Sequence, residues 1–249
     1  MTIVSSRVLA QVFGLTVVAT VCAAAPLRAQ TLVAGGSLSP NGTPFAQTFS
    51  SLSQFGSLVA ATENTYTADN SANPSLNLVV TIRSAAYQDS NGFYSFVYQV
   101  ANSPSSGQFD AIGRVTASTY SAADGTDFST NLFYSTADTD GSGIFTAGTV
   151  RAENANRTND GDTVSFGFVD SGTTTKVRPG DTSATLVVQT NARTFTTGPV
   201  AVSNGLTING IGFAPSAPSA FAAPEPGTLT LCGLVLAGAG AFWKRRRRY

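Results

Sequence analysis

The residue types that carry most enzyme chemistry are sparse in this 249-residue chain. There is no histidine, which removes the commonest general base and transition-metal ligand and excludes a Ser-His-Asp triad. The two cysteines, Cys22 and Cys232, lie in apolar terminal segments, so the middle of the chain has no thiol nucleophile, thiolate zinc site or internal disulfide. The middle holds two glutamates, Glu63 and Glu153, and no motif pairs its acids for glycoside hydrolysis. We therefore expect a protein that is not an enzyme.

One acidic segment has ligands of the kind that a hard cation prefers. The stretch 138–143 reads Asp-Thr-Asp-Gly-Ser-Gly, so Asp138 and Asp140 alternate as in an acidic calcium loop. The EF-hand pattern fails at its fifth position, Ser142, and at its twelfth, Thr149. Asp-Gly is also a common hairpin turn. The sequence leaves both interpretations, a turn and a Ca²⁺ site, open here and at 159–162. Calcium is the one cofactor candidate.

A period-two aromatic pattern offers a second kind of site. Tyr94, Phe96 and Tyr98 share one face of a predicted strand and could stack on sugar rings, or they could form core. Phe93 and Val97 make the other face partly apolar, which favours a core strand buried on both sides.

The net charge of the middle of the chain argues against one class of partner. The middle carries seven basic and thirteen acidic residues, a formal charge of −6, which disfavours nucleic acid.

The first 29 residues have the pattern of a secretory signal peptide. Arg7 precedes an apolar run at 8–25, and Ala29 supplies a small residue before Gln30. Two other interpretations are open. An uncleaved anchor would keep the same apolar run, and a lipoprotein would use Cys22, although Val21 stands where a small residue is expected.

The last part of the chain has four consecutive features. A Pro/Ala/Ser linker covers 214–223, and the motif Pro224, Glu225, Pro226 follows it. An uncharged apolar run at 228–243 is sixteen residues long; as a helix it would span about 24 Å, short for a bilayer core of about 30 Å. A basic block then fixes the cytoplasmic side. Its members are Lys244, Arg245, Arg246, Arg247 and Arg248.

The last three of these features in this order, over 224–249, resemble the PEP-CTERM sorting signal. The resemblance implies recognition at Pro224, Glu225 and Pro226 by exosortase, a membrane-embedded processing enzyme, in an exopolysaccharide-associated pathway. It implies a protein that is exported, held transiently in the inner membrane and then passed to the cell surface or exterior. The alternative is a permanent single-pass anchor in which Pro226 only starts the helix.

The segment between the two ends, 30–213, has the pattern of an all-β domain. Apolar residues alternate at 76–83 and 93–100, and Asn91-Gly92 between them predicts a hairpin. Residues 45–55 fit either an amphipathic helix or a loop that leads into a strand near 56–61. Short strands separated by turns predict an antiparallel, Ig-like or jelly-roll-like β-sandwich of about eight to ten strands. The further strands are expected at 111–118, 127–134, 143–151, 163–170, 183–189, 194–201 and 206–213.

Overall fold

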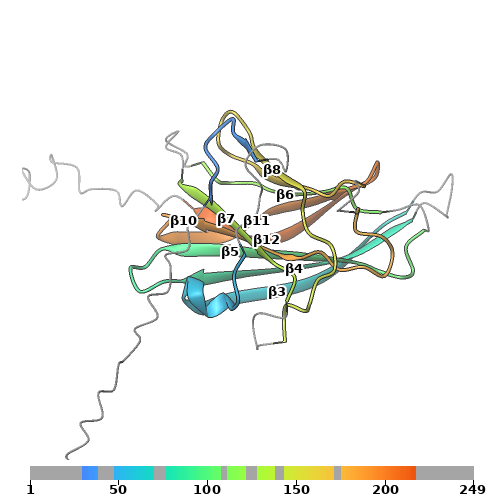
Figure 1. The fold of residues 1–249 in the computed structure, drawn as a ribbon, viewed down its shortest axis with the longest axis horizontal. Coiled ribbons are helices and arrows are strands. Elements are labelled where there is room, and N and C mark those ends of the chain that lie inside the picture. Colours follow the sequence, from blue (N-terminus) through green and yellow to red (C-terminus); the bar gives the residue numbers. More distant parts are fainter. Residues whose placement is uncertain are drawn as a thin grey trace, which may run out of the picture.

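The computed structural model of the chain describes residues 30–38, 48–69, 77–107, 111–121, 128–137, 143–170 and 175–216. Over these residues the fold has β-strands, one short 3-10 helix and no α-helix, which confirms the all-β class (Figure 1). The elements in chain order are β1 (Gln30–Thr31), β2 (Ser37–Leu38), η1 (Leu52–Phe55), β3 (Ser57–Ala68), β4 (Leu78–Gln88), β5 (Tyr94–Asn102), β6 (Arg114–Ala117), β7 (Thr130–Ser135), β8 (Asn154–Arg157), β9 (Val164–Gly167), β10 (Thr185–Thr190), β11 (Thr194–Ser203) and β12 (Thr207–Ser216).

The strands form two six-stranded sheets whose neighbouring strands pair antiparallel. Sheet A has the order β1-β7-β10-β5-β4-β3, and sheet B has the order β12-β11-β6-β9-β8-β2. The predicted hairpin joins β4 to β5. Gly92 has φ +81°, which glycine adopts without strain. Asp89 closes the turn because its Oδ1 accepts hydrogen bonds from the N–H groups of Asn91 (2.9 Å) and Phe93 (2.8 Å).

The two sheets share one hydrophobic core. Alternation along β4 turns Val80 and Ile82 inward, where side chains of sheet B such as Val115 and Phe166 meet them. Each such fully buried side chain contributes roughly 1.5–3 kcal/mol of transfer free energy. Strand β5 lies between β10 and β4, and its side chains are buried on both faces, as the apolar residues on both sides of that strand predict.

A second, smaller cluster covers part of the outer face of sheet A. Phe49, which precedes η1, and Phe55, its last residue, pack edge to face, with ring centroids 5.2 Å apart. Phe145 joins them on Val97 from the segment 143–150. Residues 45–55 were expected to form either an amphipathic helix or a loop that leads into a strand. Over 48–55, the part that the structure describes, a single 3-10 turn leads directly into β3.

Several predicted bounds need correction. There are twelve strands among the described residues rather than eight to ten, because two-residue β1 and β2 lie at sheet edges. The predicted strand at 143–151 is wrong. That segment makes only the isolated bridge of Val150 with Ser183, and the backbone of Thr146 bonds to the Gln99 side chain instead. Strand β12 reaches Ser216, so residues 214–216 of the predicted linker lie in the sheet.

The predicted signal peptide at 1–29 and the apolar run at 228–243 lie outside the described residues. Within the described ranges, no helix is long and apolar enough to cross a membrane.

Candidate functional site

The residues predicted to carry the sorting function lie outside the part of the chain that the structure describes. They are Pro224, Glu225 and Pro226 of the motif and Lys244, Arg245, Arg246, Arg247 and Arg248 of the basic block. The same is true of Asp138 and Asp140, the candidate calcium ligands. The structure does describe the strand that leads toward the motif and the segment that follows Asp140.

Strand β12 is the last described element before the sorting motif, and both of its edges are bonded. One edge pairs with β11 from Thr207 to Ser216. On the other edge, the N–H of Ile211 donates to the Tyr66 hydroxyl (3.0 Å) and the N–H of Phe213 to Ser84 Oγ (2.9 Å). The Tyr98 hydroxyl donates to the carbonyl of Phe213. Side chains of sheet A thus attach the edge of sheet B.

Two glycines allow β12 to lie this close to sheet A. A Cβ on Gly210 would stand 2.6 Å from Ile82 Cδ1 and 2.8 Å from the Tyr66 ring. A Cβ on Gly212 would stand 3.0 Å from Ser84 Oγ, the atom that accepts from Phe213. Any larger residue at these positions would push β12 away from its side-chain partners.

A buried tyrosine pair supports the same attachment. The hydroxyls of Tyr98 and Tyr120 are 2.8 Å apart, and both side chains are fully buried. Burial, the largest cause, raises the pKa of both phenols; for Tyr120 the proximity of Tyr98 adds to the increase, while the Arg157 charge lowers it. Arg157 Nη2 also donates to the Tyr120 carbonyl (2.8 Å). The pair is therefore protonated and structural at neutral pH.

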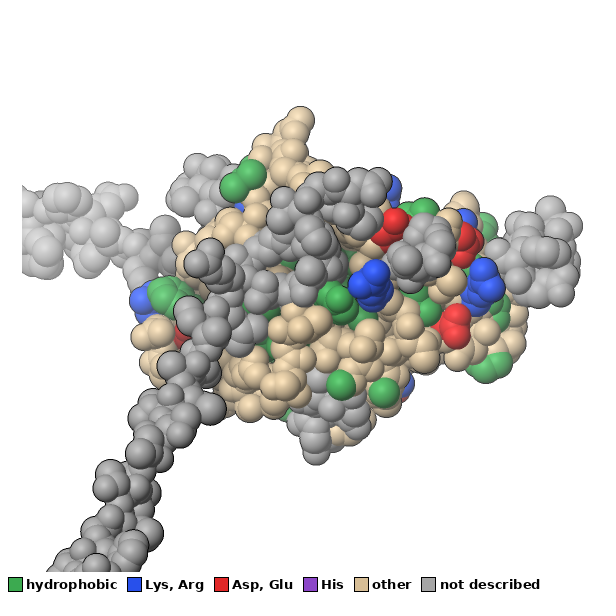
Figure 2. Space-filling model, in the orientation of Figure 1, with side chains coloured by type: hydrophobic (Ala, Val, Ile, Leu, Met, Phe, Trp, Pro, Cys, Tyr) green, Lys and Arg blue, Asp and Glu red, His purple; other side chains and the backbone are tan. Residues whose placement is uncertain are grey.

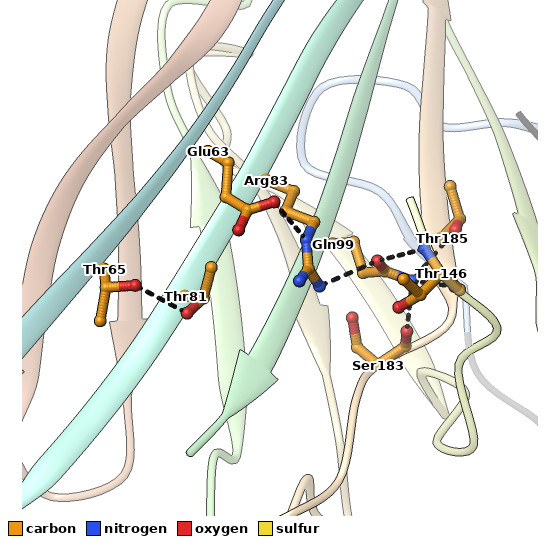
Figure 3. Close-up of polar contacts among 8 residues, drawn as sticks. All are labelled: Glu63, Thr65, Thr81, Arg83, Gln99, Thr146, Ser183 and Thr185. Atoms are coloured by element: carbon orange, nitrogen blue, oxygen red, sulfur yellow. Dashed lines mark hydrogen bonds and ion pairs between the residues drawn. The ribbon is translucent and has the colours of Figure 1, made fainter. Parts of the chain in front are cut away.

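A polar row crosses β3, β4 and β5 on the outer face of sheet A and reaches Thr185 of β10, whose hydroxyl accepts from Gln99 Nε2 at 3.3 Å (Figure 3). Arg83 Nε donates to Glu63 Oε2 at 2.9 Å, and one Nη donates to Gln99 Oε1 at 3.4 Å. The register makes Glu63, Arg83 and Gln99 cross-strand neighbours on β3, β4 and β5. The Glu63 side chain is 51% exposed and that of Arg83 is 16% exposed, so the guanidinium is held more tightly than the carboxylate.

Gln99 is the buried centre of this row. Its Nε2 donates to the carbonyls of Thr146 (2.7 Å) and Ser183 (3.2 Å), and its Oε1 accepts from the N–H of Thr146 (3.1 Å). These bonds fasten the segment 143–150 across sheet A. The sequence pattern did not predict this role of Gln99. The available signal was a glutamine at a position of β5 where the neighbouring residues are apolar, because a buried amide requires partners.

The aromatic stripe on β5 belongs to the core. Tyr94, Phe96 and Tyr98 are 8%, 0% and 0% exposed, and their neighbours include Phe195 at a centroid distance of 4.9 Å from Tyr94. The interpretation of these rings as a sugar-binding platform is therefore wrong, and the core interpretation is confirmed.

The acidic stretch 159–162 forms the turn between β8 and β9. Gly161 has φ +71°, and its N–H donates to the Thr158 carbonyl (2.9 Å). Asp160 Oδ1 accepts from the Thr158 hydroxyl and from the N–H of Asp162, and these bonds lower the pKa of Asp160, the hydroxyl bond most. The turn interpretation is confirmed for this loop. Among the described residues there is no group of three or more Asp, Glu, His or Cys that could hold a metal ion.

Part of the outer face of sheet B carries a row of small side chains, most of them polar; Arg114 lies on the same face. One cross-strand row can be followed through the registers of all six strands. Thr116 and Ser165 in this row are hydrogen bonded at 3.3 Å, and Ser118 and Thr163 in the next row at 3.2 Å. Sequence analysis did not identify this face, because it depends on the pairing of distant strands. The row consists of Asn209, Ala201, Thr116, Ser165, Asn156 and Ser37.

An open cleft of about 650 Å³ lies between η1 and the β4–β5 turn. Asp89 is its charged lining residue among those described, and its Oδ1 already accepts the two hydrogen bonds that close the turn. Gln54 and Gln88 supply amides to the same lining. The cleft therefore presents hydrogen-bonding groups.

Comparison with known proteins identifies the segment beyond β12. Residues 222–248 match the family model described as the PEP-CTERM protein-sorting motif. The chain therefore carries a PEP-CTERM sorting signal at these residues, which confirms the resemblance inferred from the Pro-Glu-Pro motif, the apolar run and the arginine cluster. Such a signal indicates an exported protein that an exosortase-type enzyme sorts at the membrane before surface display. No curated protein and no solved structure matches the chain.

Proposed function

We propose that this protein is a non-enzymatic component of the cell surface or extracellular matrix, delivered by its sorting signal in an exopolysaccharide-associated pathway. In this proposal the two sheets form a β-sandwich ectodomain, the exported cargo. The apolar run at 228–243 holds the protein in the inner membrane until an exosortase-type enzyme cuts near Pro224, Glu225 and Pro226.

The match at 222–248 is the observation that carries this proposal. Its position relative to the fold adds support, because β12 ends at Ser216 and only residues 217–221 separate the sheet from the match. A fully extended chain of that length reaches roughly 20 Å. The enzyme would therefore work close to a folded domain whose last strand is bonded on both edges. On the face that Figure 2 displays, Lys, Arg, Asp and Glu side chains are scattered singly or in small groups.

Replacing Pro224, Glu225 and Pro226 together with alanine tests the sorting step. We expect the variant to accumulate in the inner membrane of the native host, while the wild-type protein reaches the surface or the medium. A matched control replaces Pro218 with alanine, which changes a preceding proline and leaves the motif intact. Normal release of the motif variant would contradict the proposal.

Carbohydrate binding is a second candidate, and the polar row on the outer face of sheet B favours it. Hydroxyl and amide groups in such a row can exchange hydrogen bonds with sugar hydroxyls. The test is retardation of the protein in gels that contain polysaccharide from the host. Replacing Thr116 and Ser165 with alanine should reduce retardation, whereas the same change at the Thr65–Thr81 pair of sheet A (2.9 Å) should not. Equal retardation of the two double variants and the wild type would exclude this face.

A calcium-dependent adhesion module on the same anchor remains a prediction at Asp138 and Asp140. Binding of Ca²⁺ to the folded state alone would raise the melting temperature, and above the dissociation constant the increase would grow with the logarithm of the calcium concentration. The increase should disappear when both aspartates are changed to asparagine. A melting temperature that does not change with calcium would contradict the prediction of a Ca²⁺ site.

A further inference from the structure

The four edges of the two sheets are not equally protected against pairing with another strand. Edge strands β1 and β2 have two residues each, so they offer almost no backbone for pairing. The edge of β12 is bonded to the hydroxyls of Tyr66, Ser84 and Tyr98. Short strands and covered edges are the usual means by which proteins avoid association through strand pairing.

Strand β3 is the exception among the described edges. It is twelve residues long, and its described partner is β4 alone (Figure 1). It contains no lysine, arginine or proline, the residues that commonly block an edge. Its one charged residue, Glu63, is paired with Arg83 on the neighbouring strand at 2.9 Å. Most of the strand is exposed, and its outer edge is a long row of backbone donors and acceptors without net charge.

The regular part of this strand is self-complementary. The register of β3 with β4 shifts between Leu58 and Ala60 and is then unbroken to Ala68. Residues 60–68 read Ala-Ala-Thr-Glu-Asn-Thr-Tyr-Thr-Ala, which is centred on Asn64. An antiparallel copy paired about Asn64 would place Glu63 opposite Thr65, alanine opposite alanine or threonine, and threonine opposite tyrosine. No like charges face each other, and pairs of β-branched and aromatic residues stabilise such a ladder.

We propose that β3 is a homodimerisation edge. Two copies of this chain pair β3 with β3 antiparallel about a two-fold axis at Asn64, so that sheet A continues from one copy into the other. This is strand addition with the protein itself as the partner, and it does not depend on the sorting or carbohydrate proposals.

Charge substitutions of opposite sign at Thr65 test both the edge and its register. The full chain, solubilised in a neutral detergent, is studied by sedimentation equilibrium over a range of concentrations. In the proposed dimer, residue 65 of each copy faces Glu63 of the other copy, so this pair occurs twice. Thr65→Lys should therefore tighten the dimer roughly fivefold, and Thr65→Glu should weaken it roughly fivefold. Both variants lose the same hydrogen bond to Thr81, so that loss does not distinguish them.

Thr207→Lys and Thr207→Glu are matched controls, because Thr207 is exposed at the start of β12 in sheet B. Melting temperatures of all four variants check that each is folded. A dimer that responds in opposite directions to the two charges at residue 65, and does not respond at residue 207, is the expected result. A monomeric wild-type chain would overturn the proposal. A dimer of equal affinity in the Thr65→Lys and Thr65→Glu variants would also overturn it, because association through the apolar termini would not depend on the charge at residue 65.

Discussion

Replacing Tyr98 with phenylalanine should loosen the attachment of β12, the strand that precedes the sorting segment. The Tyr98 hydroxyl is 2.8 Å from that of Tyr120 and donates to the carbonyl of Phe213. Tyr98 and Tyr120 are fully buried, so water does not reach the site. The substitution removes both bonds, deprives the Tyr120 hydroxyl of its partner and leaves the ring packing in place.

The expected loss is about 2–3 kcal/mol of unfolding free energy. Each hydrogen bond contributes about 0.5–1.5 kcal/mol net, and a buried polar group left without a partner costs about 1–3 kcal/mol. For a domain of this size that corresponds to a decrease of roughly 4–12 °C in melting temperature. Urea unfolding of the full chain, followed by circular dichroism, measures the free energy.

The matched control is Tyr66→Phe, which removes the acceptor of the Ile211 N–H on the same strand. Tyr66 is only partly buried, so water can replace its hydroxyl, and the cost should stay below about 1 kcal/mol. The reasoning would be refuted if Tyr98→Phe lost less than about 0.5 kcal/mol, or no more than the control.

Three further predictions follow from the same contacts. Burial raises the pKa of Tyr98 and Tyr120, so the folded state keeps protons that unfolded tyrosines lose near their ordinary pKa of about 10. The contribution of this pair to the unfolding free energy is complete below about pH 10 and declines above it by up to roughly 1.4 kcal/mol per pH unit for each tyrosine. Urea unfolding at alkaline pH measures this decline, and Tyr98→Phe should halve its slope. Gly210→Val should cost roughly 1–3 kcal/mol in the same assay, because its Cβ overlaps sheet A, whereas Asn209→Val on the exposed side should change stability by less than about 0.5 kcal/mol. Gln99→Leu should cost roughly 1–3 kcal/mol and accelerate amide hydrogen exchange in the segment that this side chain fastens to sheet A.

Local patterns predicted the parts of the fold that are governed by local physics. The alternation at 93–100 and the Asn91-Gly92 turn identified a hairpin whose second strand is buried on both faces. Alternation failed where burial is one-sided and the residues are small or polar. Strand β3 extends to Ala68, well beyond the predicted 56–61, because threonine and asparagine at an exposed edge give no apolar period. Strand β8, Asn-Ala-Asn-Arg, gave no signal for the same reason.

The segment 143–151 failed in the opposite way. Its apolar residues Ile144 and Phe145 suggested a strand, but they pack on the second cluster outside sheet A. The amide of Gln99 satisfies the backbone of Thr146 there in place of a neighbouring strand. In both this segment and the edge of β12, side chains bond to backbone groups that a neighbouring strand would otherwise pair. These contacts join residues far apart in the sequence, so the periodicity of the sequence does not predict them. The sorting signal was predictable because it is a short linear motif.

The intact mass of the mature protein, recovered separately from the membrane and extracellular fractions of its host, tests the central claim most directly. The account predicts a product that begins near Gln30 and ends near Pro224, Glu225 and Pro226, and any additional mass would identify what replaces the tail. A product that retains Trp243 and the arginines after it in both fractions would contradict the account, because the C-terminal segment would then be a permanent anchor.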